Sequence, residues 1–210
     1  MSEPNHQTTS INQAWAHEDE KLFRTLNTSV GSHTSWIPCE TFEDPLAAWW
    51  GAYLRGLKPV AKNTDQRKIR VAELFCGPGG FALGARQAIL ELGYLFESAA
   101  AIDIDHEALK VYQLNHASQH IQCVSASMLV DSSLKRSKDT VKYKYRPELI
   151  DDRLAPHLLD VDLLLAGPPC QGYSNLNNQT RGIDERNGLY LTVPDLAIAA
   201  NIPIVVIENV

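Results

Sequence analysis

The residues best suited to chemistry in this sequence are a cysteine that follows two prolines and a glutamate near the last residue. Cys170 stands in the stretch GPPCQGYS, residues 167–174, directly after the apolar run DLLLA. Pro168 and Pro169 fix their own φ angles and bias the residues before them toward extended backbone, so the cysteine has little conformational freedom. A thiol held at the end of a strand can act as a nucleophile once it is deprotonated. The alternative is an inert small hydrophobic side chain, the usual state of a lone cysteine.

The glutamate is the second candidate for the same chemistry. Glu208 follows the apolar run IPIVVI, residues 202–207, which indicates a buried strand that ends beside it. A buried carboxyl in that position can have a raised pKa and can hold or donate a proton. Alone, Glu208 could be a strand-end acid that bonds to neighbouring backbone. Paired with Cys170, it becomes a candidate catalytic residue.

A glycine-rich turn occurs earlier, in ELFCGPGGF, residues 73–81. Gly77, Gly79 and Gly80 allow a sharp turn and a close approach of a ligand to the main chain. The helix expected to follow presents free N–H groups that suit a carboxylate or a phosphate. The alternative is a tight strand-to-helix turn without a ligand. The G-x-G-G spacing differs from the G-x-G-x-x-G pattern of dinucleotide sites, which disfavours NAD.

An acid follows the next predicted strand, in AIDIDHEA. Asp103 comes after Gly80 at about the separation at which an acid meets ribose hydroxyls in such folds. Ile104 beside it could lie against a flat adenine. One of the two aspartates is expected to cap the next helix, and we assign the cap to Asp105. The glycine turn and Asp103 together indicate a ligand with ribose, adenine and an anionic tail.

Alternating strands and helices predict an α/β fold with a Rossmann-like, doubly wound parallel sheet whose ligands bind at the carboxyl ends of the strands. The expected strands are 68–75, 98–103, 121–126, 160–167 and 202–210, and the expected helices are 81–92, 106–115 and one near 190–200. The predicted domains are an N-terminal appendage of unknown role, residues 1–66, with a helix at 44–57, and a catalytic domain, residues 67–210. The polar segment 131–153 carries seven basic residues against five acids, a balance that does not favour DNA binding by this segment alone.

Composition narrows the function classes further. The 210 residues have a formal net charge of −6, which is unusual for a protein that holds a nucleic-acid backbone. Cys39, Cys76 and Cys123 are far apart in sequence and are read as inert, so no metal site is expected. No apolar run is long enough to cross a bilayer and the first residues lack a signal peptide, so we expect a cytoplasmic protein without a membrane partner.

In their order, five stretches of this sequence resemble the cytosine-C5 DNA methyltransferase family. They are ELFCGPGGF, AIDIDHEA, DLLLAGPPCQGYSN, DERNGLY and IENV, and they cover roughly residues 68–210. The resemblance implies the sheet of S-adenosylmethionine-dependent methyltransferases, with that molecule as cofactor. It implies that Phe75, Gly77, Gly79 and Gly80 line its methionine end, Asp103 its ribose and Ile104 its adenine, with Leu189 also in the pocket. Ser127 stands where the family usually has an acid for the adenine amine.

The resemblance also implies the reaction. The Cys170 thiolate attacks C6 of a cytosine flipped out of double-stranded DNA, C5 then takes the methyl group, and Glu208 bonds the N3 and amine edge. Gln171, Ser174 and Arg186 would lie on the loop that closes over the extruded base, although each could equally be an ordinary solvated loop residue.

The family continues beyond the glutamate motif with an arginine-bearing strand, a target-recognition region and a final helix. These are not in this sequence, so we expect a sheet that is incomplete at its C-terminal edge, where the last strand leaves an unpaired apolar edge. Three hypotheses remain: an inactive fragment, the catalytic subunit of a split enzyme with a second subunit or C-terminal half, or a cofactor-binding module without catalysis. Within the enzymes, an RNA cytosine-C5 methyltransferase is the alternative, which the residues QGYS disfavour. The target sequence and a restriction-modification, regulatory or phage-related role stay open.

Overall fold

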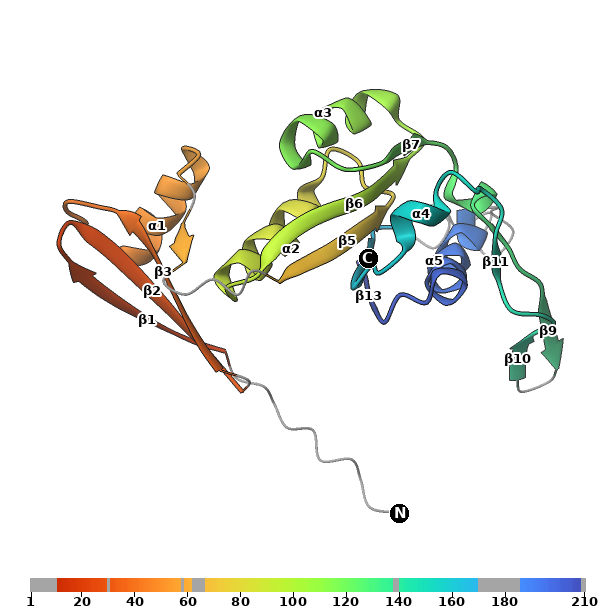
Figure 1. Cartoon of the computed structure of the whole chain (residues 1–210), viewed down its shortest axis with the longest axis horizontal. Helices are drawn as coiled ribbons and strands as arrows, with labels where there is room; N and C mark the ends of the chain where they lie inside the picture. Colours follow the sequence, from red (N-terminus) through yellow and green to blue (C-terminus); the bar gives the residue numbers. More distant parts are fainter. Residues whose placement is uncertain are drawn as a thin grey trace, which may run out of the picture. The chain divides into compact units, whose positions relative to one another are not determined.

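A computed structural model describes residues 11–29, 31–57, 59–61, 67–137, 140–169 and 186–208 (Figure 1). The chain divides into two compact units. Unit 1 comprises Met1–Lys68 and Arg86–Leu95, and unit 2 comprises Ile69–Ala85 and Phe96–Val210. The predicted domain boundaries, 1–66 and 67–210, stay a prediction. Among the described helices, none is both long enough and apolar enough to span a bilayer.

Unit 2 contains a five-stranded parallel sheet, as the sequence predicted, and its strands lie in the order β13-β12-β5-β6-β7. Its strands are β5 (Lys68–Leu74), β6 (Leu95–Asp103), β7 (Ile121–Cys123), β12 (Leu163–Ala166) and β13 (Ile204–Ile207). The strand order reverses between β5 and β12, and ligands of open α/β sheets bind at the carboxyl ends of strands beside such a reversal.

The helices of the predicted fold are also confirmed. They are α2 (Gly80–Glu91), α3 (His106–His116) and α5 (Arg186–Ala200), with a short α4 (Ala155–Leu158) before β12. Strand β7 is shorter than the predicted 121–126, because the chain leaves the sheet after Cys123 and forms a 3₁₀ turn, η1 (Ala126–Met128).

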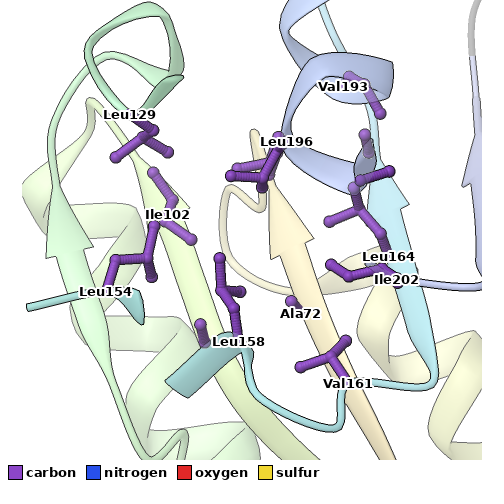
Figure 2. Packing of buried hydrophobic residues seen from close by; sticks show 14 of the residues in the cluster. Ala72, Ile102, Leu129, Leu154, Leu158, Val161, Leu164, Val193, Leu196 and Ile202 are labelled. Atoms are coloured by element: carbon purple, nitrogen blue, oxygen red, sulfur yellow. The ribbon is translucent and has the colours of Figure 1, made fainter. Parts of the chain in front are cut away.

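Both faces of the sheet are buried. On one face, apolar residues of β5, β6 and β12 pack against α4, α5 and η1; Ala72, Ile102 and Leu164 are fully buried there, and Figure 2 shows Leu158 and Leu196 in the same cluster. On the other face, a second cluster holds Ala82 of α2 together with residues of α3 and β6. Because central parallel strands are covered on both sides, they appear in the sequence as continuous apolar runs.

Strand β13 departs from that pattern. It pairs with β12 and has no second neighbour among the described strands. The expectation of a buried strand is wrong in this structure: Ile204 is 56% exposed and Val206 is 43% exposed. The reason is the edge position, which leaves these side chains without a covering layer in the described chain.

The polar segment between β7 and β12 has more structure than the sequence indicated. Strand β8 (Val130–Asp131) pairs antiparallel with β11 (Glu148–Leu149), and β9 (Leu134–Ser137) pairs antiparallel with β10 (Thr140–Tyr143). In Figure 1, the β9–β10 hairpin projects from the body of unit 2, beyond β11 and α5.

Unit 1 contains a four-stranded antiparallel sheet that the sequence analysis did not predict. Its strands are β1 (Asn12–Glu18), β2 (Lys21–Thr28), β3 (Gly31–Pro38) and β4 (Val60–Ala61), and the predicted helix is α1 (Pro45–Leu54). The Asp44 carboxylate caps α1 by accepting the N–H groups of Leu46 and Ala47. Leu22, Ile37 and Trp49 form the centre of its small core.

The second half of α2, residues 86–91, belongs to unit 1, where Glu91 forms a buried ion pair. Glu91 lies 3.6 Å from Arg24, between the Oε1 and Nη1 atoms, and its Oε2 accepts a 2.9 Å hydrogen bond from the Ser35 hydroxyl. The Arg24 guanidinium also lies 5.7 Å from the rings of Trp15 and Trp49. Burial raises the pKa of Glu91, and Arg24 and Ser35 oppose that shift.

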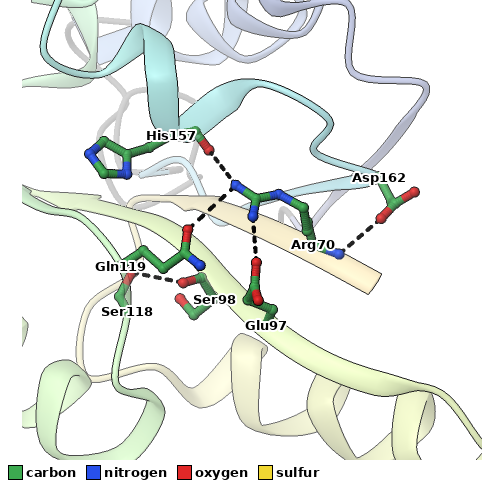
Figure 3. A network of polar contacts seen from close by, with 7 residues as sticks. All are labelled: Arg70, Glu97, Ser98, Ser118, Gln119, His157 and Asp162. Carbon is green, nitrogen blue, oxygen red and sulfur yellow. Dashed lines mark hydrogen bonds and ion pairs between the residues drawn. The ribbon is translucent and has the colours of Figure 1, made fainter. Parts of the chain in front are cut away.

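A polar network connects the amino ends of the strands in unit 2 (Figure 3). The Arg70 guanidinium of β5 donates to the Glu97 carboxylate of β6 and to the His157 carbonyl oxygen of α4, 3.4 Å away. The Arg70 backbone N–H donates to the Asp162 carboxylate over 2.9 Å, just before β12. This network lies at the edge opposite to the carboxyl ends of the strands.

Candidate functional site

The ends of three neighbouring strands determine which predicted residues meet. Ala166 of β12 is in register with Leu74 of β5 and with Ile207 of β13, so the three strands end at the same level. The Gly167 N–H donates to the Leu74 carbonyl over 3.4 Å, and the Glu208 N–H donates to the Ala166 carbonyl over 2.9 Å. The glycine loop, the GPP segment and Glu208 therefore leave the sheet side by side.

The loop after β5 has an unusual backbone. Phe75 has a φ of 55°, although it is not glycine, and Gly77 and Gly79 have φ values of 49° and 94°. A Cβ on Gly79 would lie 2.4 Å from Nε2 of His116, so Gly79 permits α3 to pack against the loop. A Cβ on Gly77 or Gly80 would meet nothing within 4 Å, so these two positions face open space.

Asp103 connects this loop to the start of α3. Its Oδ2 accepts the N–H of Gly77 over 2.8 Å and its Oδ1 accepts the N–H of Asp105 over 2.9 Å. The Asp105 side chain in turn accepts the N–H groups of Glu107 and Ala108, which confirms its predicted capping role. Each Asp103 oxygen has a further lone pair for an outside donor such as a hydroxyl group.

The two residues expected to meet an adenine lie in accessible positions. Ile104 is 73% exposed, next to Asp103. Ser127 is exposed in η1, and its hydroxyl oxygen lies 2.9 Å from that of Ser125. Leu189 is half-buried in the first turns of α5.

Glu73, inside the motif ELFCGPGGF, is a functional candidate that the sequence pattern did not indicate. Glu73 is 1% exposed, lies two residues before Phe75, and has one carboxylate oxygen, Oε2, without a hydrogen-bond partner in the described chain. Burial raises its pKa to about 8, while hydrogen bonds from the Tyr112 hydroxyl and the Ala82 N–H oppose the shift. The available signal was an acid inside the apolar run VAELF, where a charge needs a buried partner.

The neighbours of Glu73 behave as an internal polar cluster. The Tyr112 hydroxyl lies within hydrogen-bond distance of the Ser98 hydroxyl, 3.2 Å away, and Tyr112 is fully buried. Burial, with the Glu73 and Asp103 carboxylates nearby, also raises the pKa of the Cys76 thiol. Cys76 therefore stays protonated at neutral pH, as expected of an inert cysteine.

Glu208 lies next to the first residue of the cysteine motif. Its Oε2 is 4.0 Å from the position that a Cβ on Gly167 would occupy. Glu208 is exposed, which corrects the expectation of a buried carboxyl. The cause is again the edge position of β13, because the preceding strand does not carry Glu208 into the interior.

The remaining predicted site residues are not all described. Cys170, Gln171 and Ser174 lie outside the described residues, and so does the side chain of Arg186 at the start of α5. Within the described part of the chain, no group of three or more histidine, cysteine, aspartate or glutamate side chains could hold a metal ion.

The fold and this edge define a Rossmann-like α/β protein with a glycine loop and acids at the strand reversal. A family model, C-5 cytosine-specific DNA methylase, matches residues 69–210. The chain belongs to this family.

Named relatives agree with the family match. The type II methyltransferase M1.BsuMI of Bacillus subtilis is 34% identical over 153 residues, which are 73% of this chain and 34% of that protein. The type II methyltransferase M.HgiGI of Herpetosiphon aurantiacus is 29% identical over 144 residues, 68% of this chain and 90% of that sequence. The DNA (cytosine-5)-methyltransferase PliMCI of Paracentrotus lividus is 31% identical over 118 residues. The chain spans about a third of M1.BsuMI and 6% of PliMCI.

Proposed function

We propose that this chain is the catalytic part of a DNA (cytosine-5)-methyltransferase that transfers a methyl group from S-adenosylmethionine to C5 of cytosine. One observation carries the proposal: β5, β12 and β13 end in register, which sets the glycine loop, the segment leading to Cys170 and Glu208 at one edge. A methyl donor, a nucleophile and an acid must all reach a single pyrimidine ring, and neighbouring strand ends satisfy that requirement.

The described residues fit the proposed cofactor. Gly77 and Gly80 face open space, so the main chain from Phe75 through Gly80, including Gly79, can approach the methionine end closely. Asp103 retains lone pairs for the ribose hydroxyls, Ile104 offers an exposed apolar surface to adenine, and Leu189 would contribute to the pocket wall. When bound, S-adenosylmethionine supplies an electrophilic methyl group on a sulfonium centre.

The chain's own residues would activate the cytosine. The Cys170 thiolate forms a bond to C6, and the electrons of the C5–C6 double bond become available at C5, which takes the methyl group. Glu208 would bond the N3 and amine edge and stabilise the charge that develops there. A base then removes the C5 proton as the Cys170–C6 bond breaks, which restores the double bond and frees the thiolate.

The substrate we propose is a cytosine flipped out of double-stranded DNA, because C6 cannot be reached inside the base stack. Gln171, Ser174 and Arg186 would contact the extruded nucleotide. Glu208 is exposed in the free chain, so the bound ring itself would shield it from water and strengthen its hydrogen bonds.

We further propose that additional strands pair with β13 and that a target-recognition region comes from a C-terminal continuation or a second subunit. The exposed apolar side chains of β13 support this, since such an edge is rarely left uncovered. The names of the type II relatives support a restriction-modification role in the cytoplasm as the working hypothesis.

Covalent trapping tests the nucleophile. The chain, with a candidate C-terminal partner, is incubated with S-adenosylmethionine and a duplex that contains 5-fluorocytosine, which blocks the final loss of the C5 substituent. We expect an adduct that survives denaturing electrophoresis for the wild type and none for Cys170→Ala. An equal adduct yield in Cys170→Ala would refute the assignment, and preferential trapping by 5-fluorocytosine RNA would indicate an RNA enzyme.

A calorimetric experiment separates the enzyme from a binding module. Cofactor binding is measured for the wild type, Cys170→Ser and Asp103→Ala. Both hypotheses predict that Cys170→Ser still binds and that Asp103→Ala binds at least about tenfold more weakly, because the ribose loses its acceptor. Binding that survives Cys170→Ser, together with no methyl transfer under any complementation, would support the module without catalysis.

A further inference from the structure

The β9–β10 hairpin separates charges that are balanced in the sequence. Residues 131–153 contain seven basic and five acidic residues, but residues 134–146 contain six basic residues and one acid. Three of the remaining acids, Glu148, Asp151 and Asp152, follow the hairpin, and Asp131 precedes it. The fold therefore concentrates positive charge on a projecting ribbon (Figure 1), in a chain whose formal net charge is −6.

Three lysines share one face of this ribbon. Lys135 and Lys142 are direct cross-strand partners in the register of β9 and β10. Lys144 is two residues beyond Lys142, so its side chain lies on the same face, and its N–H continues the pairing by donating to the Ser133 carbonyl over 2.8 Å. All three side chains are exposed.

This arrangement is unfavourable for the hairpin alone. Like charges directly opposite each other destabilise an antiparallel pair, and a two-stranded hairpin has little stability to spare. A row of phosphates would turn the repulsion between Lys135 and Lys142 into attraction for a shared partner. The charge pattern is therefore better suited to a bound polyanion than to the free chain.

The other face of the hairpin is fixed to α5. The Tyr143 hydroxyl donates to Oδ1 of Asp195 over 2.6 Å, and the Ser132 hydroxyl donates to Oδ2 of the same carboxylate, which is 6% exposed. Beyond the end of β10, the Arg146 guanidinium also donates to the Ile198 carbonyl of α5 over 2.8 Å. These bonds hold the lysine face in a set orientation on the helix that follows residues 170–185 in the chain.

We propose that Lys135, Lys142 and Lys144 form a sequence-independent contact to the phosphate backbone of DNA. The inference rests on the proposed function, which makes DNA the polyanion that this chain meets. Lysines are point charges that neutralise phosphates without reading bases, so the hairpin would hold the duplex and leave sequence recognition to other elements. The surface that these three lysines form is cationic. A lipid surface or an apolar protein partner would need apolar side chains beside them, and the three positions supply none.

The first test is the salt dependence of duplex binding by the full chain. Fluorescence anisotropy with a labelled 20-base-pair duplex is measured between 50 and 200 mM salt for the wild type and the triple variant K135Q/K142Q/K144Q. We expect at least about a tenfold loss of affinity at 50 mM salt and a loss of about 2 to 3 in the slope of log K against log salt. The matched control is Lys110→Gln, a lysine of α3 paired with Glu107, which should leave both quantities unchanged.

A second variant separates a contact from a structural role. Lys142→Glu places opposite charges across the hairpin, so it should slow hydrogen exchange of the β9 and β10 amides and yet weaken DNA binding. Weaker binding together with faster amide exchange would show that the lysines act only through the fold and would overturn the proposal. Unchanged binding in the triple variant, no binding by the wild type at 50 mM salt, or tighter lysine-dependent binding of duplex RNA would also overturn it.

The DNA-binding experiments on the hairpin and the trapping experiment on the proposed function can fail independently of each other. If the 5-fluorocytosine adduct forms and the triple variant binds DNA normally, the hairpin assignment fails and the enzyme assignment stands. If the lysine substitutions weaken binding and no adduct forms under any complementation, the hairpin contact stands and the enzyme assignment fails.

Discussion

The two edges of the parallel sheet use polar residues in opposite ways. At the amino edge, Arg70, Glu97 and Asp162 satisfy one another across β5, β6 and the turn before β12. At the carboxyl edge, Glu208 is exposed and Ile104 is 73% exposed. The first arrangement stabilises the fold, because the terminal guanidinium nitrogens of Arg70 and the carboxylates of Glu97 and Asp162 are hydrogen-bonded within it. The second leaves binding capacity for an outside molecule, at a cost in stability that the rest of the unit must offset.

At the carboxyl edge itself, the underside of the glycine loop is tightly packed: Gly79 lies against His116, which is buried, and Glu73 is buried just before the loop. The underside of the loop therefore lies at the carboxyl edge, but its side chains are buried and packed as those of the amino edge are. Substitutions at neighbouring positions should therefore have different effects: those on the packed underside should lower stability, and those at the exposed positions should affect binding or activity.

The largest effect is expected at the underside of the loop. Gly79→Ala places a Cβ 2.4 Å from Nε2 of His116 at a φ of 94°, so α3 or the loop must move. We expect a loss of about 2–4 kcal/mol in the free energy of unfolding, measured by urea denaturation. Gly80→Ala is the matched control, since nothing lies within 4 Å of its Cβ position, and it should change stability by less than about 0.5 kcal/mol. Equal losses in the two variants would contradict the packing role of Gly79.

The amino edge should respond next. Arg70→Met keeps approximately the length of the side chain but removes its hydrogen bonds to the partly buried Glu97 carboxylate and to the His157 carbonyl. We expect a loss of about 2 kcal/mol in unfolding free energy. Arg153→Met serves as the control, because Arg153 is 79% exposed beside Asp151 and exposed ion pairs contribute little. A similar loss in both variants would mean that the network does not stabilise the sheet.

A pH profile tests the buried acid. The folded-state pKa of Glu73 is raised from 4.5 to about 8, so between these values the folded state holds a proton that the unfolded state has lost. The contribution of Glu73 therefore lowers stability as pH rises through this window, with a slope of at most about 1.4 kcal/mol per pH unit. Glu73→Gln should remove this slope, whereas Glu107→Gln, at an exposed position, should keep it. Unfolding curves of the three proteins at pH 5.5 and 7.5 measure the difference, and parallel profiles would show that Glu73 is ionised in the fold.

The smallest effect on stability is expected at the carboxyl edge. Glu208→Gln removes the charge of an exposed side chain without removing its shape, so unfolding free energy should change by less than about 0.5 kcal/mol. Under the proposed function, adduct formation with 5-fluorocytosine DNA should fall by at least about 100-fold, because the N3 edge loses its partner. A large loss of stability, or unchanged adduct formation, would remove the contrast between the two edges at this residue.

Local sequence was sufficient for most of the parallel sheet. Strands covered on both faces need continuous apolar runs, so VAEL and LLLA identify β5 and β12 without knowledge of their partners. The turns at the glycines and prolines after the strands, and the helix cap at Asp105, depend only on neighbouring residues. They could therefore also be predicted from the sequence.

The strands of unit 1 were harder to predict from the sequence, because their sheet has one buried face and its turns lack the residues that usually mark hairpins. The Asp19–Glu20 turn has a positive φ at both residues, 51° and 58°. An Asn-Gly pair at such a turn would have predicted a hairpin, but Asp-Glu does not. In β2, the burial of Leu22 depends on Ile37 and Trp49, which are distant in sequence. A half-buried antiparallel strand therefore becomes recognisable only once its partners are known.

By itself, the sequence determined the positions of the strands along the chain, the edge at which the glycine loop and Glu208 emerge, and the type of chemistry these residues can support. Tertiary structure alone decided that Glu73 is buried with one oxygen lacking a partner among the described residues, that Glu208 is exposed, and that three lysines share one face of a hairpin fixed to α5. The physical reason is that local propensity depends on adjacent residues, whereas burial and the alignment of charges depend on strand pairing and on contacts between residues far apart in the chain.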